Sequence, residues 1–103
     1  MRSMFARSPL AALALAVLIG TISDRTTGQP LSGVVITLGT AHATSHDDGS
    51  YRLSGVKAGQ AIVTVSSDDV PPQRFPVTVG TTTSRADLRV CSTTLDYNCG
   101  PLQ

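Results

Sequence analysis

The sequence predicts an antiparallel β-sandwich of seven strands. Helix-forming surface residues are scarce, because charged residues make up only 15% of the chain, all seven acidic residues are aspartate and lysine occurs once. Threonine, serine, valine and glycine are common, and they favour strands and turns. Short runs of alternating apolar and polar residues are separated by turn residues, which is typical of strands that bury one face. The length of 103 residues suits one small domain.

Seven segments show this alternation. Successive side chains of a strand point to opposite faces of its sheet, so every second apolar residue is expected to face a single core. Threonine and charged residues occupy most of the positions between them, where they remain in contact with water. In chain order, the segments span residues 18–23, 34–38, 42–45, 51–53, 61–65, 75–79 and 86–90.

Two turn signals divide the first half of the chain. The segment DRTTGQP, residues 24–30, ends the first strand with Gly28 and Pro30. Asp48-Gly49 is a pair typical of tight hairpins, because glycine adopts positive φ values without strain. We therefore predict a hairpin turn at Asp48 and Gly49.

The second half of the chain is divided in the same way. A glycine-bounded turn is expected at residues 55–59, and a polar loop that ends in two prolines spans residues 66–72. Pro76 lies inside an alternating run and has no backbone N–H to donate to a neighbouring strand. Its strand is therefore expected at the edge of a sheet, or bulged at this residue.

The N-terminus has the composition of a secretion signal. Arg2 and Arg7 precede an apolar run at residues 9–19, and no acidic residue occurs there. This run of 11 residues is too short to span a bilayer, which needs about 20. Residues 14–16 form an A-x-A site, so we predict cleavage after Ala16; an uncleaved apolar strand or a membrane anchor is the alternative.

The predicted organisation is a signal peptide at residues 1–16, a sandwich at 17–90 and a C-terminal tail at 91–103. Loss of Arg2 and Arg7 leaves six basic and seven acidic residues, a net charge of −1. This near-neutral balance does not favour nucleic acid or an anionic membrane as a partner. The mature protein is expected to be secreted or periplasmic, with no stable membrane span after cleavage.

Two cysteines lie near the C-terminus, at Cys91 and Cys99. An exported chain meets an oxidising compartment, in which a disulfide between them is the simplest arrangement. Such a short loop would stabilise the fold by about 2–3 kcal/mol in the chain-entropy view. A metal site would need more ligands than two cysteines.

Two motifs resemble those of carboxypeptidase regulatory-like domains. The first, LIGTISDRTTGQPLSGVVITL, follows the family's pattern of an I-x-G-x-V-x-D strand, a T-G-x-P-L turn and a G-a-x-V-x-L strand. The second, TSHDDGSYRLSGVKAGQAIVTVS, resembles T-x-x-D-G-x-Y-x-L-x-x-V-x-x-G. The matching residues are Leu18, Gly20, Ile22, Asp24, Thr27, Gly28, Pro30, Leu31, Gly33, Val34, Ile36 and Leu38 in the first, and Thr44, Asp48, Gly49, Tyr51, Leu53, Val56 and Gly59 in the second.

The resemblance implies a seven-stranded, Greek-key, transthyretin-like (prealbumin-like) β-sandwich. Domains of this family are typically non-catalytic and accompany secreted peptidases, outer-membrane receptors and surface proteins. They resemble starch-binding-type modules in fold. The chain departs from the family pattern at Ala61, where an aromatic residue is common, and at residues 67–70, where a G-Y/F pair is missing.

The stretch SHDDGS contains residue types found in catalytic triads. Ser45, His46 and Asp47 are adjacent, however, and adjacent side chains of an extended chain point in opposite directions. No G-x-S-x-G nucleophile elbow occurs. We therefore expect no catalytic residue here and predict that the protein is not an enzyme.

Metal binding is not expected either. His42 and His46 would lie about 13 Å apart on a strand, too far for one metal ion. Asp47 and Asp48 could suggest calcium, but an EF-hand loop also needs a glutamate and the chain has none. No cofactor is predicted, because the glycines are scattered through turns rather than gathered in a phosphate-binding loop.

Three functions remain from these observations. The first is a secreted, non-catalytic module that binds or supports an extracytoplasmic protein. The second is a carbohydrate-binding module with a glycan partner, for which Tyr97 is the candidate contact because Tyr51 and Phe75 fit the core pattern. The third, a transthyretin-like hydrolase of 5-hydroxyisourate, would require a C-terminal Y-R-G-S, but the chain ends in NCGPLQ.

Asp68 and Asp69 form an acidic pair that we expect to be solvated.

Overall fold

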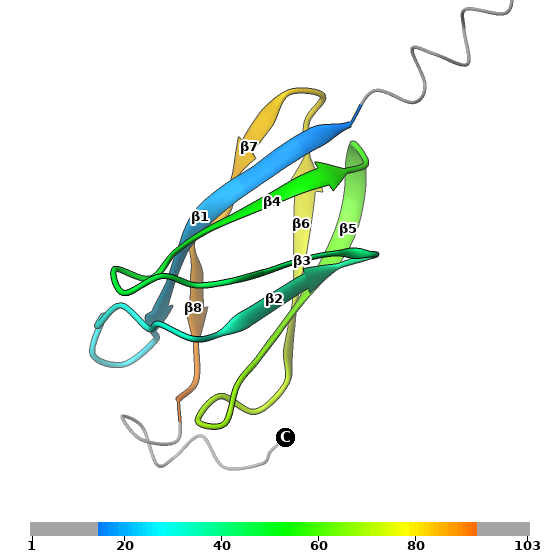
Figure 1. Cartoon of the computed structure of the whole chain (residues 1–103). Coiled ribbons are helices and arrows are strands. Elements are labelled where there is room, and N and C mark those ends of the chain that lie inside the picture. The colour runs from blue at the N-terminus through cyan, green and yellow to red at the C-terminus, as the bar shows by residue number, and fades with distance from the viewer. Residues whose placement is uncertain (1–14, 93–103) are drawn as a thin grey trace, which may run out of the picture.

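The computed structural model describes residues 15–92, which form eight β-strands and no helix (Figure 1). The strands make two four-stranded sheets that pack against each other as a sandwich. Within residues 15–92, no helix is long and apolar enough to cross a membrane. The strands are β1 (Ala16–Asp24), β2 (Val35–Leu38), β3 (Ala41–Thr44), β4 (Ser50–Val56), β5 (Gly59–Ser66), β6 (Gln73–Val79), β7 (Thr83–Arg85) and β8 (Leu88–Val90).

The first sheet is built around β1. Strand β4 pairs with one side of β1 in antiparallel orientation, whereas β7 and β8 follow one another along the other side and both run parallel to it. The sheet is therefore mixed, and the prediction of a purely antiparallel sandwich was wrong for these pairs. Apolar alternation fixes which face of a strand is buried, but it carries no information about the direction of the neighbouring strand.

The second sheet has the strand order β3-β2-β5-β6 and is antiparallel throughout. Pro76 lies on β6, so the prediction that its strand is an edge strand is confirmed. It pairs in register with Ile62 of β5. Because proline has no N–H, this pair cannot exchange ladder hydrogen bonds, and the Pro76 nitrogen faces the free edge. The edge consequently lacks a donor at its centre.

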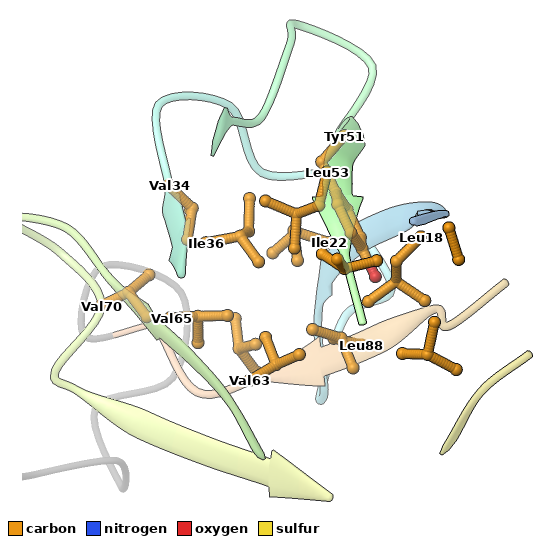
Figure 2. Close-up of a cluster of buried hydrophobic side chains, with 14 residues drawn as sticks. Leu18, Ile22, Val34, Ile36, Tyr51, Leu53, Val63, Val65, Val70 and Leu88 are labelled. Atoms are coloured by element: carbon orange, nitrogen blue, oxygen red, sulfur yellow. The ribbon is translucent and has the colours of Figure 1, made fainter. Parts of the chain in front are cut away.

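The core lies between the two sheets and is made of aliphatic side chains and one tyrosine (Figure 2). The alternation in the sequence identifies nearly all of it. Three core residues lie outside the predicted strands: Ala16 was assigned to the signal peptide, Val56 to a turn and Val70 to the polar loop after β5, yet each is at most 2% exposed. The buried members drawn from the alternating segments are Leu18, Ile22, Val34, Ile36, Tyr51, Leu53, Val63, Val65, Val79, Leu88 and Val90.

The last predicted strand, residues 86–90, is divided in the structure. The chain forms β7 and β8 with an interruption at Ala86 and Asp87, so eight strands are present in place of the seven expected. At the interruption, the Ala86 N–H donates to the Ile19 carbonyl at 2.8 Å. The Thr21 N–H donates to the Asp87 carboxylate at 3.0 Å, so a side chain replaces the missing backbone acceptor.

Gly20 lies in β1 beside this interruption. The Ala86 carbonyl turns inward over Gly20 so closely that a Cβ at this position would overlap it. The Tyr51 hydroxyl donates a hydrogen bond to the same carbonyl, which satisfies it away from water. Burial raises the pKa of Tyr51 to about 12; the Asp87 carboxylate also raises it, and the Arg85 guanidinium lowers it.

A buried carboxylate organises the turn after β1. Asp24 is 0% exposed, and its Oδ2 accepts hydrogen bonds from the N–H groups of Thr26 at 3.0 Å and Thr27 at 2.8 Å, and from the Thr27 hydroxyl at 3.1 Å. Its carbonyl accepts from the Gly28 N–H at 2.9 Å. Burial raises the pKa of Asp24, but the hydrogen bonds outweigh burial and leave the pKa below its usual value.

The side chain of Gln73 joins the two sheets at the end of the sandwich. Its Nε2 donates to the Cys91 carbonyl at 3.0 Å, and its Oε1 accepts from the Cys91 N–H at 2.9 Å. The amide thus pairs with the backbone after β8 in the way that a neighbouring strand would. Nε2 also donates to the Pro71 carbonyl at 3.0 Å, which fixes the loop before β6.

Replacing Tyr51 by phenylalanine should destabilise the domain by about 1–2 kcal/mol, because the buried Ala86 carbonyl loses its donor. The loss should depend on pH. A folded-state pKa of about 12 exceeds the ordinary value of 10, so the stabilisation by Tyr51 is complete below pH 10 and is lost as the pH rises towards 12. Urea unfolding should show that the difference in free energy of unfolding between wild type and Tyr51→Phe becomes smaller above pH 10. A difference in free energy of unfolding that stays constant up to pH 11.5 would contradict the role of the Tyr51 hydroxyl as the donor to Ala86.

Candidate functional site

The stretch SHDDGS forms the turn between β3 and β4. The Gly49 N–H donates to the His46 carbonyl at 2.8 Å, and the His46 N–H donates to the Ser50 carbonyl at 2.9 Å. Gly49 has a φ of 82°, and no other residue type among residues 15–92 has a positive φ, so Asp48 keeps an ordinary conformation. Strands β3 and β4 belong to different sheets. The turn thus carries the chain from one sheet to the other, so the prediction of a turn at Asp48 and Gly49 is confirmed, but the prediction that it closes a hairpin was wrong.

Ser45 is committed to the backbone around it. Its hydroxyl donates to the Leu31 carbonyl at 2.8 Å and accepts from the Val34 N–H at 2.9 Å. The side chain is 5% exposed. A nucleophilic serine needs a base within hydrogen-bond reach, and here both functions of the hydroxyl are taken by main-chain groups. Ser45 therefore holds two loops together.

Asp48 and Gly49 also serve the turn. The Asp48 carboxylate accepts hydrogen bonds from the Ser50 N–H at 3.0 Å and the Ser50 hydroxyl at 2.6 Å, and these bonds lower the pKa of Asp48. A Cβ on Gly49 would lie 2.6 Å from the Ile22 carbonyl oxygen, so only glycine fits against β1. An open polar hollow over the turn is lined by Ser45, His46, Asp47, Asp48 and Ser50.

The other polar candidates do not converge. His42 is exposed on β3 opposite Thr37, away from the turn that contains His46. Asp68 and Asp69 are exposed in the loop between β5 and β6. Across residues 15–92, no three histidine, cysteine or acidic side chains are grouped so that they could hold a metal ion.

The predicted disulfide is described only at one end. Cys91 is 7% exposed and directly follows β8, where Gln73 fixes its backbone. Cys99 lies outside the described residues, so its pairing with Cys91 stays a prediction. Tyr97 lies outside them as well, and its role as a ligand contact is not described.

The outer face of β5 and β6 presents an apolar surface to solvent. Ile62 is 47% exposed, although it lies mid-strand, and its cross-strand neighbour is the exposed Pro76. Polar Gln60 and Thr78 form the next pair along the two strands. These four residues are called the Ile62 patch, and they line a hollow of about 480 Å³ together with Ala61 and Val77.

An apolar centre with a polar border is typical of a protein-binding surface. The sequence contains one signal for the Ile62 patch that the alternation analysis does not include. In the segment 61–65 the inward positions are Ala61, Val63 and Val65, so Ile62 is an apolar residue at an outward position. The sequence does not show which residue of β6 lies beside Ile62, because this depends on the register of the two strands. In the structure this residue is Pro76.

Comparisons with known proteins agree with the two sequence motifs. The family described as carboxypeptidase regulatory-like domain matches residues 17–90, which confirms the resemblance. No curated protein sequence matches the chain. Among solved structures, the fold is similar to that of a proposed carbohydrate-binding protein from Bacteroides uniformis, with a TM-score of 0.59 and 18% identity. The match covers 75% of this chain and 41% of that one, so the chain spans less than half of that protein's length.

Replacing Ser45 by alanine tests the structural role of this serine. The change leaves the buried Val34 N–H without its acceptor, so we expect a loss of about 1–3 kcal/mol in the free energy of unfolding. His46→Ala changes an exposed side chain in the same turn and should stay within about 0.5 kcal/mol of wild type. Urea denaturation measures both. Equal stability of the two variants would show that the Ser45 hydroxyl does not support the backbone.

Proposed function

Since this chain belongs to the carboxypeptidase regulatory-like domain family, we propose that it is a secreted, non-catalytic β-sandwich module that binds another extracytoplasmic protein. The observation that carries the proposal is the Ile62 patch, an exposed apolar surface on a sheet that is otherwise rich in threonine and other polar residues. Ser45, Asp48 and Gly49 are occupied in holding the fold, which supports a binding role over a catalytic one.

The patch would bind its partner through the face of the sheet. Pro76 removes a donor from the middle of the β6 edge, so a partner strand could not extend the sheet there with a continuous ladder. Ile62 and Pro76 instead offer side chains that point outward. Burial of the remaining exposed part of Ile62 would contribute about 1 kcal/mol. The patch would therefore be the centre of a larger contact that includes its polar border.

A carbohydrate-binding module is the second candidate function. It is favoured by the similarity of the fold to that of a proposed carbohydrate-binding protein. Sugar rings usually bind against exposed aromatic faces. Tyr51 is buried, and Phe75 packs against the core, so neither aromatic residue between positions 15 and 92 offers such a face. For this reason the protein-binding function is preferred, and only Tyr97 is left as a candidate sugar contact.

Secretion is the other part of the proposal. The family match starts at Val17, directly after the predicted cleavage site. Cleavage there would remove Ala16, the first residue of β1, and leave the rest of the strand intact. Mass spectrometry of the exported protein should find Val17 as the first residue and no free thiol at Cys91 or Cys99. An exported protein that begins at Met1 would contradict signal cleavage, and thiol labelling of both cysteines would contradict the disulfide.

The Ile62 patch can be tested by capture of exported proteins on the immobilised mature chain. Wild type should retain a partner that Ile62→Asp releases, because the new carboxylate would have to be buried in an apolar contact. Ser54→Asp places the same charge on the exposed β4 strand of the other sheet and should retain the partner. Both variants should have the same midpoint of urea unfolding as wild type. Equal capture by all three proteins would contradict the patch, and capture of polysaccharide alone would favour the carbohydrate-binding function.

A further inference from the structure

The outer face of the first sheet carries two arginines in one row. Ile19 of β1 pairs with Arg52 of β4 on one side and with Arg85 of β7 on the other. Odd-numbered residues of β1 point away from the core, so all three side chains lie on the solvent face. With neighbouring strands about 4.8 Å apart, the two arginines are separated by roughly 10 Å across the sheet. This surface, Ile19, Arg52 and Arg85, is called the arginine face.

One half of the arginine face already binds a carboxylate. Arg85 contacts Asp87 through both ends of its guanidinium fork, with Nη2 3.0 Å from Oδ1 and Nε 3.1 Å from Oδ2. Thr21 completes the site, because its N–H and its hydroxyl donate to Oδ1 at 3.0 and 3.1 Å. The guanidinium of Arg85 holds the pKa of Asp87 below its usual value. The sheet thus shows how it binds a carboxylate on this side of β1.

The other half lacks this partner. Ser50 pairs with Thr21 from the β4 side and occupies the position that corresponds to Asp87. Its hydroxyl is bound to Asp48, whose carboxylate takes the N–H and the hydroxyl of Ser50. Arg52 is exposed and forms no ion pair with any residue between positions 15 and 92. A guanidinium in the same row as Arg85 therefore has no carboxylate partner among residues 15–92.

We propose that the arginine face binds a carboxylate of an acidic protein segment, with Arg52 as its anchor. The guanidinium fork of arginine matches a carboxylate in two parallel hydrogen bonds. Arg89 lies on the same face opposite Ser23 and adds a further positive charge. A protein segment is favoured over an acidic polysaccharide, because Ile19 supplies an aliphatic contact while both described aromatic residues lie in or against the core. The surface lies on the sheet opposite the Ile62 patch and is independent of it.

The test uses the mature chain with labelled poly-L-glutamate at low ionic strength, and polygalacturonate as the polysaccharide source of carboxylates. Fluorescence anisotropy should show binding to poly-L-glutamate that weakens as salt is added. Arg52→Ser should weaken it about threefold, the size expected for one exposed charge pair. Arg74→Ser removes the same charge from the outer face of β6 and should leave the affinity close to that of wild type.

Three results would overturn the proposal. The first is the absence of binding to poly-L-glutamate. The second is an equal loss of affinity in Arg52→Ser and Arg74→Ser, which would reflect net charge alone. The third is binding to polygalacturonate at least as tight as binding to poly-L-glutamate, which would assign the surface to a polysaccharide. None of these results bears on capture through the Ile62 patch.

Discussion

The close approach of the Ala86 carbonyl to Gly20 is the constraint on which the first sheet depends. The carbonyl comes from the interruption between β7 and β8, and it lies over Gly20 of the central strand, where no side chain could be accommodated. The Tyr51 hydroxyl donates a hydrogen bond to this carbonyl. Because the carbonyl turns inward, the Thr21 N–H has no backbone acceptor at the interruption and donates to the Asp87 carboxylate instead. The same Asp87 shows how the outer face binds a carboxylate, because both of its carboxylate oxygens contact the Arg85 guanidinium.

Most of the fold could be predicted because strand alternation and turn chemistry are local properties of the sequence. Leu18, Ile36 and Val65 face the core as expected, and Pro76 lies on an edge strand as its missing N–H requires. The parallel pairing of β1 with the C-terminal strands was not predictable in this way. After β6 the chain crosses to the first sheet and pairs with β1. The short connection at residues 80–82 has no turn motif that would predict this crossing.

The candidate site was less predictable than the fold. Ser45 and Asp48 are residue types found in catalytic and metal sites, but the Ser45 hydroxyl is bonded to the loop before β2 and the Asp48 carboxylate to its own turn. The surfaces that are available for binding consist of residues that look ordinary in the sequence, such as Ile62 and Arg52. Each becomes part of a binding surface only together with its cross-strand neighbour, which is Pro76 for Ile62 and Ile19 for Arg52. These neighbours can be identified only when the register between the strands is known.

The central position of β1 has a consequence for the order of folding. Among the strands of residues 15–92, β1 is the first in the chain, but its hydrogen-bonding partners on one side lie at residues 82–90. The Thr21–Asp87 contact accordingly joins residues 66 positions apart. Contacts of such long range form slowly, because a large loop must close before they contribute any stability. The first sheet can be completed only after nearly the whole domain has been made.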